Sequence, residues 1–349
     1  MVKADWAGMW PILRESYVNF AMAIPMVFAG IAVLGSIYYF GAIPPQQRGR
    51  GIRGLVAYLF PKQLYGSRSA RIDIWVWIIN GLVVVPLFAI SVAMGGMLAG
   101  EFLNRGLLAL FGPQVSIVTQ VWAIVTIQFL ASFFGQGFGQ YWSHLAMHKV
   151  PALWALHRAH HSAETANLFA FLRSHPVEIF INSGTRVACG GILLSIAIFA
   201  TGGTLLPETI HALVWYNLLY VVLGGFRSVD HTHIPIRFGG GLDILIGSPI
   251  MHQLHHSAEP QHRDVNMGGS GYIYDWLFGT VYVPRSGETW RWGLNDEEIG
   301  ERSPHRTLRA FFVDPLREFA AVLRGKRKSP AGGVKAAWHR LYRDDKRPS

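Results

Sequence analysis

The chain has 349 residues, of which 51% are hydrophobic and 15% are charged, and its formal net charge is +10. Soluble globular chains carry about a quarter charged residues, so this composition excludes an ordinary soluble domain and favours a membrane protein. The basic residues lie in loops between apolar runs and in the C-terminal tail, which a membrane surface explains better than nucleic acid does.

Five apolar runs are each long enough to supply the roughly 20 residues that cross a bilayer. They are residues 17–40, 72–94, 115–138, 179–201 and 210–226. The predicted fold is therefore all-α: a membrane bundle of about five spans with a cytosolic helical cap that holds a histidine-rich dimetal site.

Loop charges orient the predicted spans. Segment 41–71 contains six Arg and Lys residues and no acid, whereas the turn 202–209 has no positive charge. Because cytosolic loops are enriched in Lys and Arg, the N-terminus is expected outside and the C-terminus in the cytosol. Segments 139–178 and 227–304 then share the cytosolic side.

Three regions follow from this arrangement. Residues 1–138 hold the N-terminal spans, and 305–349 form a basic cytosolic tail. Between them, residues 139–304 are the expected catalytic region, in which two His-rich segments flank a transmembrane hairpin at about 179–226.

The histidines are the unusual feature of the composition. There are 15 of them and one cysteine, Cys189, so a transition metal would have to be bound by His, Asp or Glu. Three clusters have helical spacing, which places their imidazoles on one face of a helix. Their members are His144 and His148, then His157, His160 and His161, then His252, His255 and His256.

Eight clustered histidines are too many for one ion with an open position and suit two ions; His231 is a ninth candidate. Two crossings separate the second and third clusters, so all three return to one side and can meet at the membrane surface. A substrate dissolved in the bilayer could reach such a site. The competing interpretations are a surface His-rich loop, a structural zinc site, which needs only four ligands, and a haem, which takes single histidines from facing spans.

The pattern HxxxH, HxxHH and HxxHH resembles the fatty acid hydroxylase / sterol desaturase superfamily of membrane non-haem di-iron enzymes, in its bacterial type. The resemblance covers about residues 120–285 and extends beyond the clusters. It includes Arg173-Ser-His175-Pro176-Val-Glu178, Asp230-His231, Asp264-Val-Asn266 and Asp275-Trp276. In place of the usual Asn-Tyr/Phe-Gly the chain has Asn266-Met267-Gly268 followed by Gly-Ser-Gly, which leaves the ligands in place but alters the local contacts.

The resemblance implies two iron ions, O₂ as oxidant, and electrons from a ferredoxin or a cytochrome b5-type protein. The reaction would be hydroxylation or desaturation of a lipid C–H bond, the lipid being sterol-like or fatty acyl, at a bacterial inner membrane. His175, Asp264, Asn266 and Asp275 are expected to support the ligands.

Several alternatives remain open at this point. An ether lipid, a carotenoid or an alkane would also be an apolar substrate. A non-catalytic metal-binding sensor or transporter is the alternative from another class, although a transporter needs an ionisable path that the spans lack. Imidazole ligation does not choose between iron and zinc, and zinc can replace iron in overproduced protein.

Overall fold

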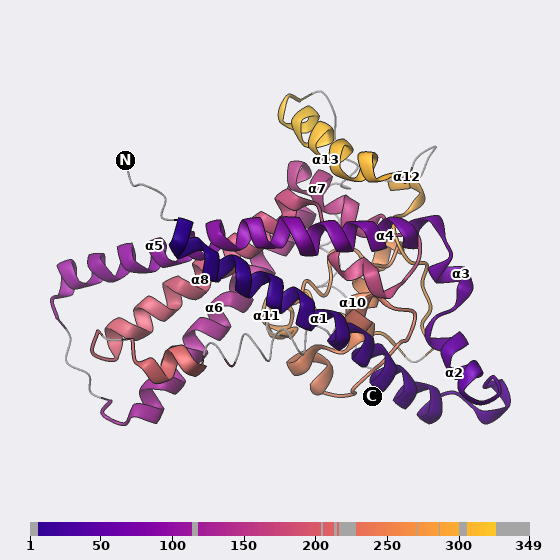
Figure 1. The fold of residues 1–349 in the computed structure, drawn as a ribbon, viewed down its shortest axis with the longest axis horizontal. Coiled ribbons are helices and arrows are strands. Elements are labelled where there is room, and N and C mark those ends of the chain that lie inside the picture. The colour runs from indigo at the N-terminus through magenta and orange to yellow at the C-terminus, as the bar shows by residue number, and fades with distance from the viewer. Residues whose placement is uncertain are drawn as a thin grey trace, which may run out of the picture.

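The computed structural model describes residues 6–113, 118–203, 205–212, 215, 228–269, 271–285, 287–299 and 306–325, and these contain helices and no β-strand. The long helices are α1 (Trp6–Gly41), α5 (Val85–Phe111), α6 (Val121–Lys149) and α8 (Pro176–Ala200). The shorter ones are α2 (Gly51–Leu59), α3 (Lys62–Tyr65), α4 (Arg68–Ile79), α7 (Pro151–His161), α10 (Pro249–His255), α11 (Ile273–Phe278), α12 (Asp296–Ile299) and α13 (Leu308–Leu323). Figure 1 shows α5, α6 and α8 beside one another, with the short α7 above α4 and the short α10 and α11 below it.

Four helices of the described chain are long and apolar enough to cross a membrane. They cover Ser16–Gly41, Arg68–Ala89, Val121–Lys149 and Pro176–Ala200. These correspond to the first four predicted spans and identify a membrane protein. The fifth predicted span, 210–226, lies almost entirely outside the described residues, so the number of crossings and the orientation remain predictions.

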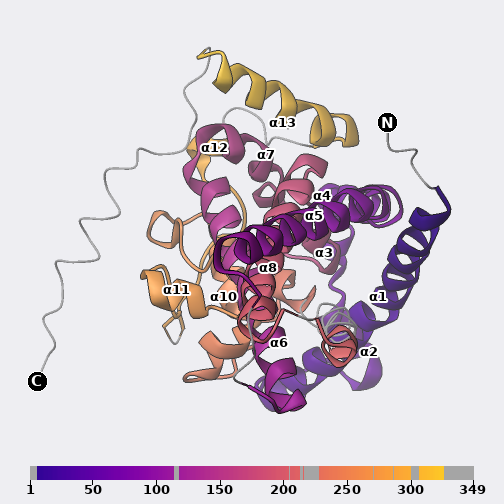
Figure 2. The ribbon, with the colours of Figure 1, turned by 90° about the vertical axis from the view of Figure 1, so that its left-hand side faces the viewer.

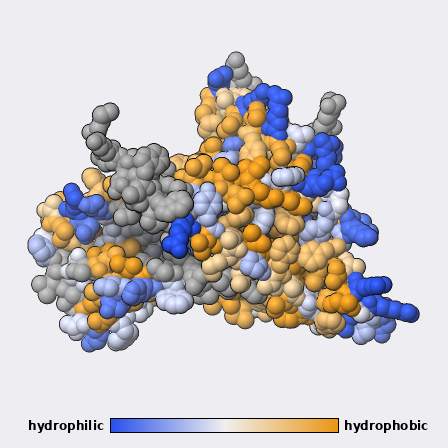
Figure 3. Space-filling model, viewed as in Figure 1, coloured by the Kyte–Doolittle hydropathy of each residue, from blue (hydrophilic) through white to orange (hydrophobic). Residues whose placement is uncertain are grey.

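The surface agrees with this assignment. Figure 3 shows a broad hydrophobic band across the middle of the molecule and hydrophilic residues toward both ends. Large apolar side chains on the long helices are exposed, including Ile37 and Leu98. Exposed apolar area of this extent requires an apolar solvent or a partner.

One segment differs from the sequence-based expectation. The second predicted span ends at residue 94, but helix continues from α4 through a π-helical turn (Asn80–Val84) into α5, which ends at Phe111. Gly96 allows this continuation to pack closely, because a Cβ there would lie 2.3 Å from Cγ1 of Val187 on α8. Close packing against α8 therefore stabilises the helix beyond the apolar run.

Small residues also bring α6 and α8 together. A Cβ at Gly135 would lie 2.6 Å from the carbonyl oxygen of Cys189, and one at Gly139 would lie 2.6 Å from that of Thr185. Glycine at such positions lets membrane helices approach at backbone distance. This contact fixes the C-terminal end of α6, which carries the first histidine cluster, beside the beginning of α8.

The cap is built from short helices that begin at prolines. Pro151 starts α7 and Pro249 starts α10, each in the first turn, where a missing N–H costs nothing. The first span contributes to the same core, since Val27 of α1 packs with Leu168 and Val229. The helices that carry histidines are therefore held against the spans.

Candidate metal centre

Nine buried or half-buried histidines form two adjacent groups. The first group contains His144, His148, His157, His161 and His255, and the second contains His160, His231, His252 and His256. Within each group, the possible ligand nitrogens all lie within 4.8 Å of one another. The structure thus brings together all nine histidines that the sequence singled out.

Alternate positions on the same helix serve different groups. His157 and His161 of α7 belong to the first group, while His160 points into the second. Likewise His255 of α10 joins the first group, and His252 the second. Helical spacing of three and four residues therefore divides each HxxHH motif between two neighbouring centres.

The distances between ring nitrogens suit a shared cation. In the first group, Nε2 of His157 lies 3.1 Å from Nε2 of His144, of His148 and of His161. In the second group, Nε2 of His252 lies 3.1 Å from Nε2 of His231 and of His256. Adjacent nitrogens around an octahedral ion with bonds of about 2.1 Å are about 3.0 Å apart, so the spacing matches coordination.

The outward-facing ring nitrogens decide the tautomers. Nδ1 of His144 lies 2.6 Å from the carbonyl oxygen of Met267, and Nδ1 of His157 lies 2.9 Å from Oε1 of Glu178. A carbonyl oxygen and an ionised carboxylate only accept, so each Nδ1–H donates to its acceptor, which leaves a lone pair on each Nε2. Two facing lone pairs at 3.1 Å repel one another unless a cation lies between them. The arrangement therefore fits a metal ion.

Three more histidines are oriented in the same way. Nδ1 of His160 donates to the carbonyl oxygen of Arg173 at 3.0 Å, and Nδ1 of His255 donates to that of Val265 at 2.8 Å. Nδ1 of His148 lies 3.4 Å from Oδ1 of Asp264. Among the described residues, Nε2 of His255 is buried without a hydrogen-bond partner, as expected of a ligand atom.

Burial keeps the imidazoles outside the spans neutral. Loss of solvation, with further effects from neighbouring histidines, lowers the pKa of His157, His161, His252 and His256 well below the usual value. Neutral imidazole is the form that binds metals, so at neutral pH these rings need no deprotonation before they coordinate.

The four expected supporting residues lie outside the two groups. Asp264 contacts His148 and also pairs with Lys149 at 2.5 Å. Burial alone would raise the pKa of Asp264, but these two partners lower it to about 2. This carboxylate therefore stays ionised and holds the outer nitrogen of His148.

Asp275 supports His144 indirectly, through the backbone of Met267. Its carboxylate accepts the N–H groups of Met267 at 2.7 Å and Gly268 at 2.8 Å, which fixes the carbonyl group that receives His144. Burial raises the pKa of Asp275 to about 6. Asn266, in the left-handed region at φ 55°, bonds the carbonyl oxygens of Met251 and Tyr282 and thereby closes the loop.

His175 does not reach the histidine groups. Its Nδ1 caps the first turn of α8, and Glu178 returns the bond to the backbone N–H of His175. Glu178 is 2% exposed and binds His157, so His175 supports the centre through that carboxylate.

Comparisons with known proteins agree with this geometry. A family model described as fatty acid hydroxylase matches residues 129–280. Residues 129–280 are thus similar to the fatty acid hydroxylase family. All nine histidines lie within the matched region, which begins in α6 and ends just after α11.

The curated relatives are lipid enzymes by name. Human alkylglycerol monooxygenase is 30% identical over 151 residues, which are 43% of this chain and 29% of the human protein. The Danio rerio protein of that name is 30% identical over 156 residues, which are 44% of this chain and 30% of the relative. Ornithine lipid hydroxylase OlsE of Rhizobium tropici is 29% identical over 147 residues, which are 42% of this chain and 39% of the relative. The chain thus spans well under half the length of these relatives, and no solved structure matches it.

The unusual glycine-rich segment of the matched region is tightly packed. A Cβ at Gly269 would lie 2.7 Å from the carbonyl oxygen of Gly137 on α6, and one at Gly271 would lie 2.3 Å from that of Leu245. Both glycines have positive φ angles. The residues that follow Asn266-Met267-Gly268 therefore fill a narrow space beside α6.

A buried residue that the sequence patterns did not single out, Asp73, pairs with Arg173 next to the second histidine group. Arg173 is 1% exposed and pairs with Asp73, while its Nε donates to the carbonyl oxygen of Ala159 at 3.0 Å. Asn167 donates to the same Asp73 carboxylate. A signal was present, because Asp73 is the single acid of the predicted span 72–94, and ionisable residues in spans mark functional sites.

Proposed function

We propose that this chain is an integral-membrane oxygenase that binds two iron ions and hydroxylates a lipid C–H bond, using O₂ and electrons supplied from outside. The observation that carries the proposal is the pair of converging histidine groups, built from the end of the membrane-length helix α6 and from the short helices beside it. The proposed ligands are the five histidines of the first group and the four of the second.

The residues around the ions have defined roles in this proposal. Two bound irons would supply the activation of O₂ and the oxidation of the C–H bond. Glu178, Asp264 and the carbonyl groups of Met267, Arg173 and Val265 hold the outer ring nitrogens, which directs each Nε2 inward. Burial of the rings limits water at the centre and fixes their geometry before any ion binds.

The names of the relatives support a narrower substrate class. Alkylglycerol monooxygenase and ornithine lipid hydroxylase are each named for a lipid and for oxygen insertion. We therefore infer that hydroxylation is the first reaction to test and desaturation the second, on a fatty acyl, ether-linked or sterol-like membrane lipid. Iron is preferred to zinc because the proposed chemistry needs a redox-active metal.

The remaining assignments follow the loop charges. The metal centre and C-terminus are proposed to face the cytosol of a bacterial inner membrane, with the N-terminus outside. Electrons would come from a ferredoxin or a cytochrome b5-type donor. Residues 1–138, 139–304 and 305–349 are proposed as the N-terminal spans, the catalytic region and a basic tail.

The decisive experiment compares total lipids from aerobic cells that produce the intact chain with those from cells producing a His160→Ala, His255→Ala variant. This variant removes one ligand from each group. Ornithine lipids and alkylglycerols are supplied to the cultures, together with a ferredoxin system. Untargeted mass spectrometry should reveal a lipid that gains one oxygen only with the intact chain.

A matched control separates chemistry from folding. Gln261→Ala changes an exposed residue near the third cluster that belongs to neither group, and should leave the product unchanged. A lipid that loses two hydrogens would establish a desaturase. No lipid change from a chain that holds two irons and receives electrons would reject the oxygenase and favour a non-catalytic metal protein.

A further inference from the structure

Helix α13 has an exposed face of unusual composition. Phe311 and Pro315 are buried against the protein, whereas Leu316 and Leu323 on the opposite side are 45% and 67% exposed. At 100° per residue, one broad outward surface contains apolar and basic side chains and no acid. Its members are Arg309, Val313, Leu316, Arg317, Ala320, Leu323 and Arg324.

The two acids of α13 lie outside this surface, Glu318 toward the protein and Asp314 at its flank. Glu318 pairs with Arg158 of α7 at 2.5 Å, and Asp314 lies 3.7 Å from Arg317. Glu318 is thus neutralised by the protein, whereas the Asp314 side chain is 43% exposed beside Arg317 and leaves Arg309 and Arg324 as further basic groups of the outward face. A helix face that contacts only water is normally polar. This face instead exposes Leu316 and Leu323 between arginines.

Three contacts place α13 at the level where spans end. The carbonyl oxygen of Phe312 accepts Nε2–H of His175, which directly precedes the span Pro176–Ala200. The carbonyl oxygen of Arg306, just before α13, accepts Nε–H of Arg68 at the first residue of another span. Helix α7, on which α13 rests, follows the span Val121–Lys149 after one residue.

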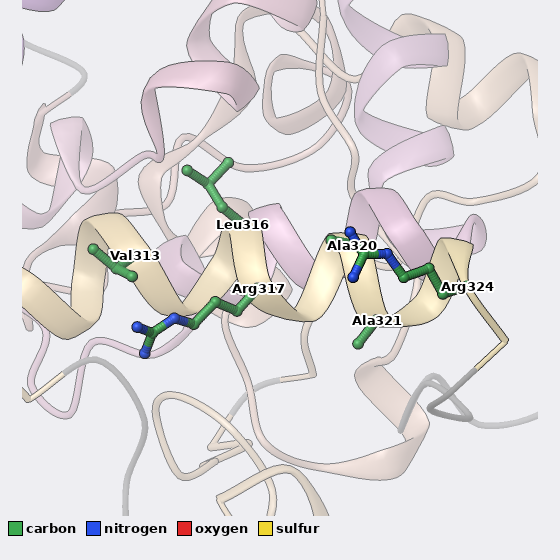
Figure 4. A pocket seen from close by; sticks show the side chains of 6 residues that line it. All are labelled: Val313, Leu316, Arg317, Ala320, Ala321 and Arg324. Atoms are coloured by element: carbon green, nitrogen blue, oxygen red, sulfur yellow. The ribbon is translucent and has the colours of Figure 1, made fainter.

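The views agree with this location. Figure 2 shows α13 above α7 at the edge of the molecule, outside the bundle of long helices. A surface groove of about 410 Å³ runs along it, lined by Val313, Leu316, Arg317, Ala320, Ala321 and Arg324. Figure 4 shows these side chains along the helix, with two guanidinium groups beside the apolar ones.

We propose that α13 is an interfacial helix, with its outward face lying in the headgroup region of an anionic membrane. Val313, Leu316, Ala320 and Leu323 would contact acyl chains. The arginines would extend along the apolar surface to phosphate groups, as long basic side chains do at such interfaces. The proposal needs only a membrane-spanning chain and holds whatever reaction the metal centre performs.

Charge and position favour lipid over a soluble acidic protein as the occupant. An anionic leaflet is necessarily present at the level where three spans end, and each nearby Arg adds about 1 kcal/mol of attraction to it. The sequence after α13 is also basic, with Lys326, Arg327 and Lys328 next. A protein partner would have to bury the same leucines while competing with that surface.

The single cysteine of the chain makes a direct test practical. In a Cys189→Ser background, a nitroxide is attached at Leu316→Cys or Ala320→Cys in full-length protein reconstituted in vesicles. The vesicles contain phosphatidylcholine with or without phosphatidylglycerol. Reference labels are placed at Ile37→Cys on the exposed side of a span and at Asp296→Cys on α12, whose side chain is 84% exposed.

Power saturation then compares the accessibility of each label to oxygen, which concentrates in lipid, and to a water-soluble nickel chelate. The ratio of oxygen accessibility to nickel accessibility at Leu316 and Ala320 should be close to the ratio at Ile37. In phosphatidylglycerol vesicles, an Arg309→Gln, Arg317→Gln, Arg324→Gln variant should shift both labels toward the Asp296 value. Metal content and helical circular dichroism establish that each variant is folded.

Two results would overturn the proposal. One is nickel accessibility at both positions equal to that of Asp296 in every vesicle. The other is protection that develops only when an acidic ferredoxin is added, which would assign the same face to a soluble electron donor.

Discussion

Glu178 is the side chain whose effect on the candidate centre is easiest to isolate. It is 2% exposed and accepts the Nδ1–H of His157, whose Nε2 is 3.1 Å from three other ring nitrogens. Without this acceptor, His157 could adopt the other tautomer and turn its lone pair outward. The carboxylate thus positions one ring that the whole first group depends on.

Replacing Glu178 by Ala should therefore weaken metal binding by about 10–100-fold, the usual cost of losing a partner of a ligand. Glu178→Gln keeps an acceptor oxygen and should cost less. Metal retained against a graded chelator series, read by mass spectrometry of the metals, checks both. Glu164→Gln is the control, because Glu164 pairs with Arg306 at the surface; equal losses in all three variants would contradict the assignment.

A second residue-scale prediction concerns Asp73. Asp73→Asn would leave the Arg173 guanidinium, itself 1% exposed, without its buried counter-charge. Breaking such a pair from one side costs about 3–5 kcal/mol. Thermal unfolding in detergent should show a large decrease in stability. Asp296→Asn removes an exposed pair with Arg291 and should cost less than about 1 kcal/mol; similar effects at both sites would refute the argument.

At the scale of elements, the contact between α6 and α8 controls where the first histidine cluster lies. A Cβ at Gly139 would lie 2.6 Å from the carbonyl oxygen of Thr185. A methyl group there would therefore push the two backbones apart. His144 lies little more than one turn further along α6, and Glu178 two turns before Thr185 on α8. Separation of these helices would therefore move His144 away from His157, the neighbouring ring that Glu178 holds.

Gly139→Ala should destabilise the protein by about 1–3 kcal/mol, as overpacking does, and should reduce metal content. Gly184→Ala is a matched control on α8, since nothing lies within 4 Å of its virtual Cβ. The two proteins can be compared by unfolding temperature and by metal per chain. Equal behaviour would show that the close approach has no structural role.

The elements also show what sequence patterns could and could not predict. Hydropathy predicted four of the helices well, because membrane solvent requires long apolar runs, and helical spacing predicted the histidine faces. The continuation of α5 to Phe111 was missed, since it depends on packing of Gly96 against Val187. Met267, Arg173 and Val265 accept through their backbone carbonyl groups. Every residue has such a group, so the sequence could not predict these contacts.

At the scale of the whole molecule, the buried histidines make stability depend on pH. Outside the spans, burial lowers the pKa of His157, His160, His161, His252, His255 and His256 in the folded protein. In the unfolded chain these rings titrate near 6.5. Below that value the unfolded chain binds protons that the folded protein does not, so acidification favours unfolding.

The metal-free protein should thus keep its full stability above about pH 6.5 and lose up to about 1.4 kcal/mol per group for each unit below it. Unfolding temperatures in detergent at about pH 7.5, 6.5 and 5.5 measure the slope. A His252→Gln, His255→Gln variant removes two such groups and should show a shallower slope. A flat profile in the unmodified protein would mean that the rings are already protonated or solvated when folded.

The division of each HxxHH motif between the two groups also has a consequence for biosynthesis. The first group takes His255 from beyond α8, and the second takes His160 from before it. A nascent chain that has not yet released residue 255 can complete neither group, and the second group needs one residue more, His256. Both centres must therefore close late and together, and a protease cut between α8 and α10 that lets the fragments part would empty them in a single event.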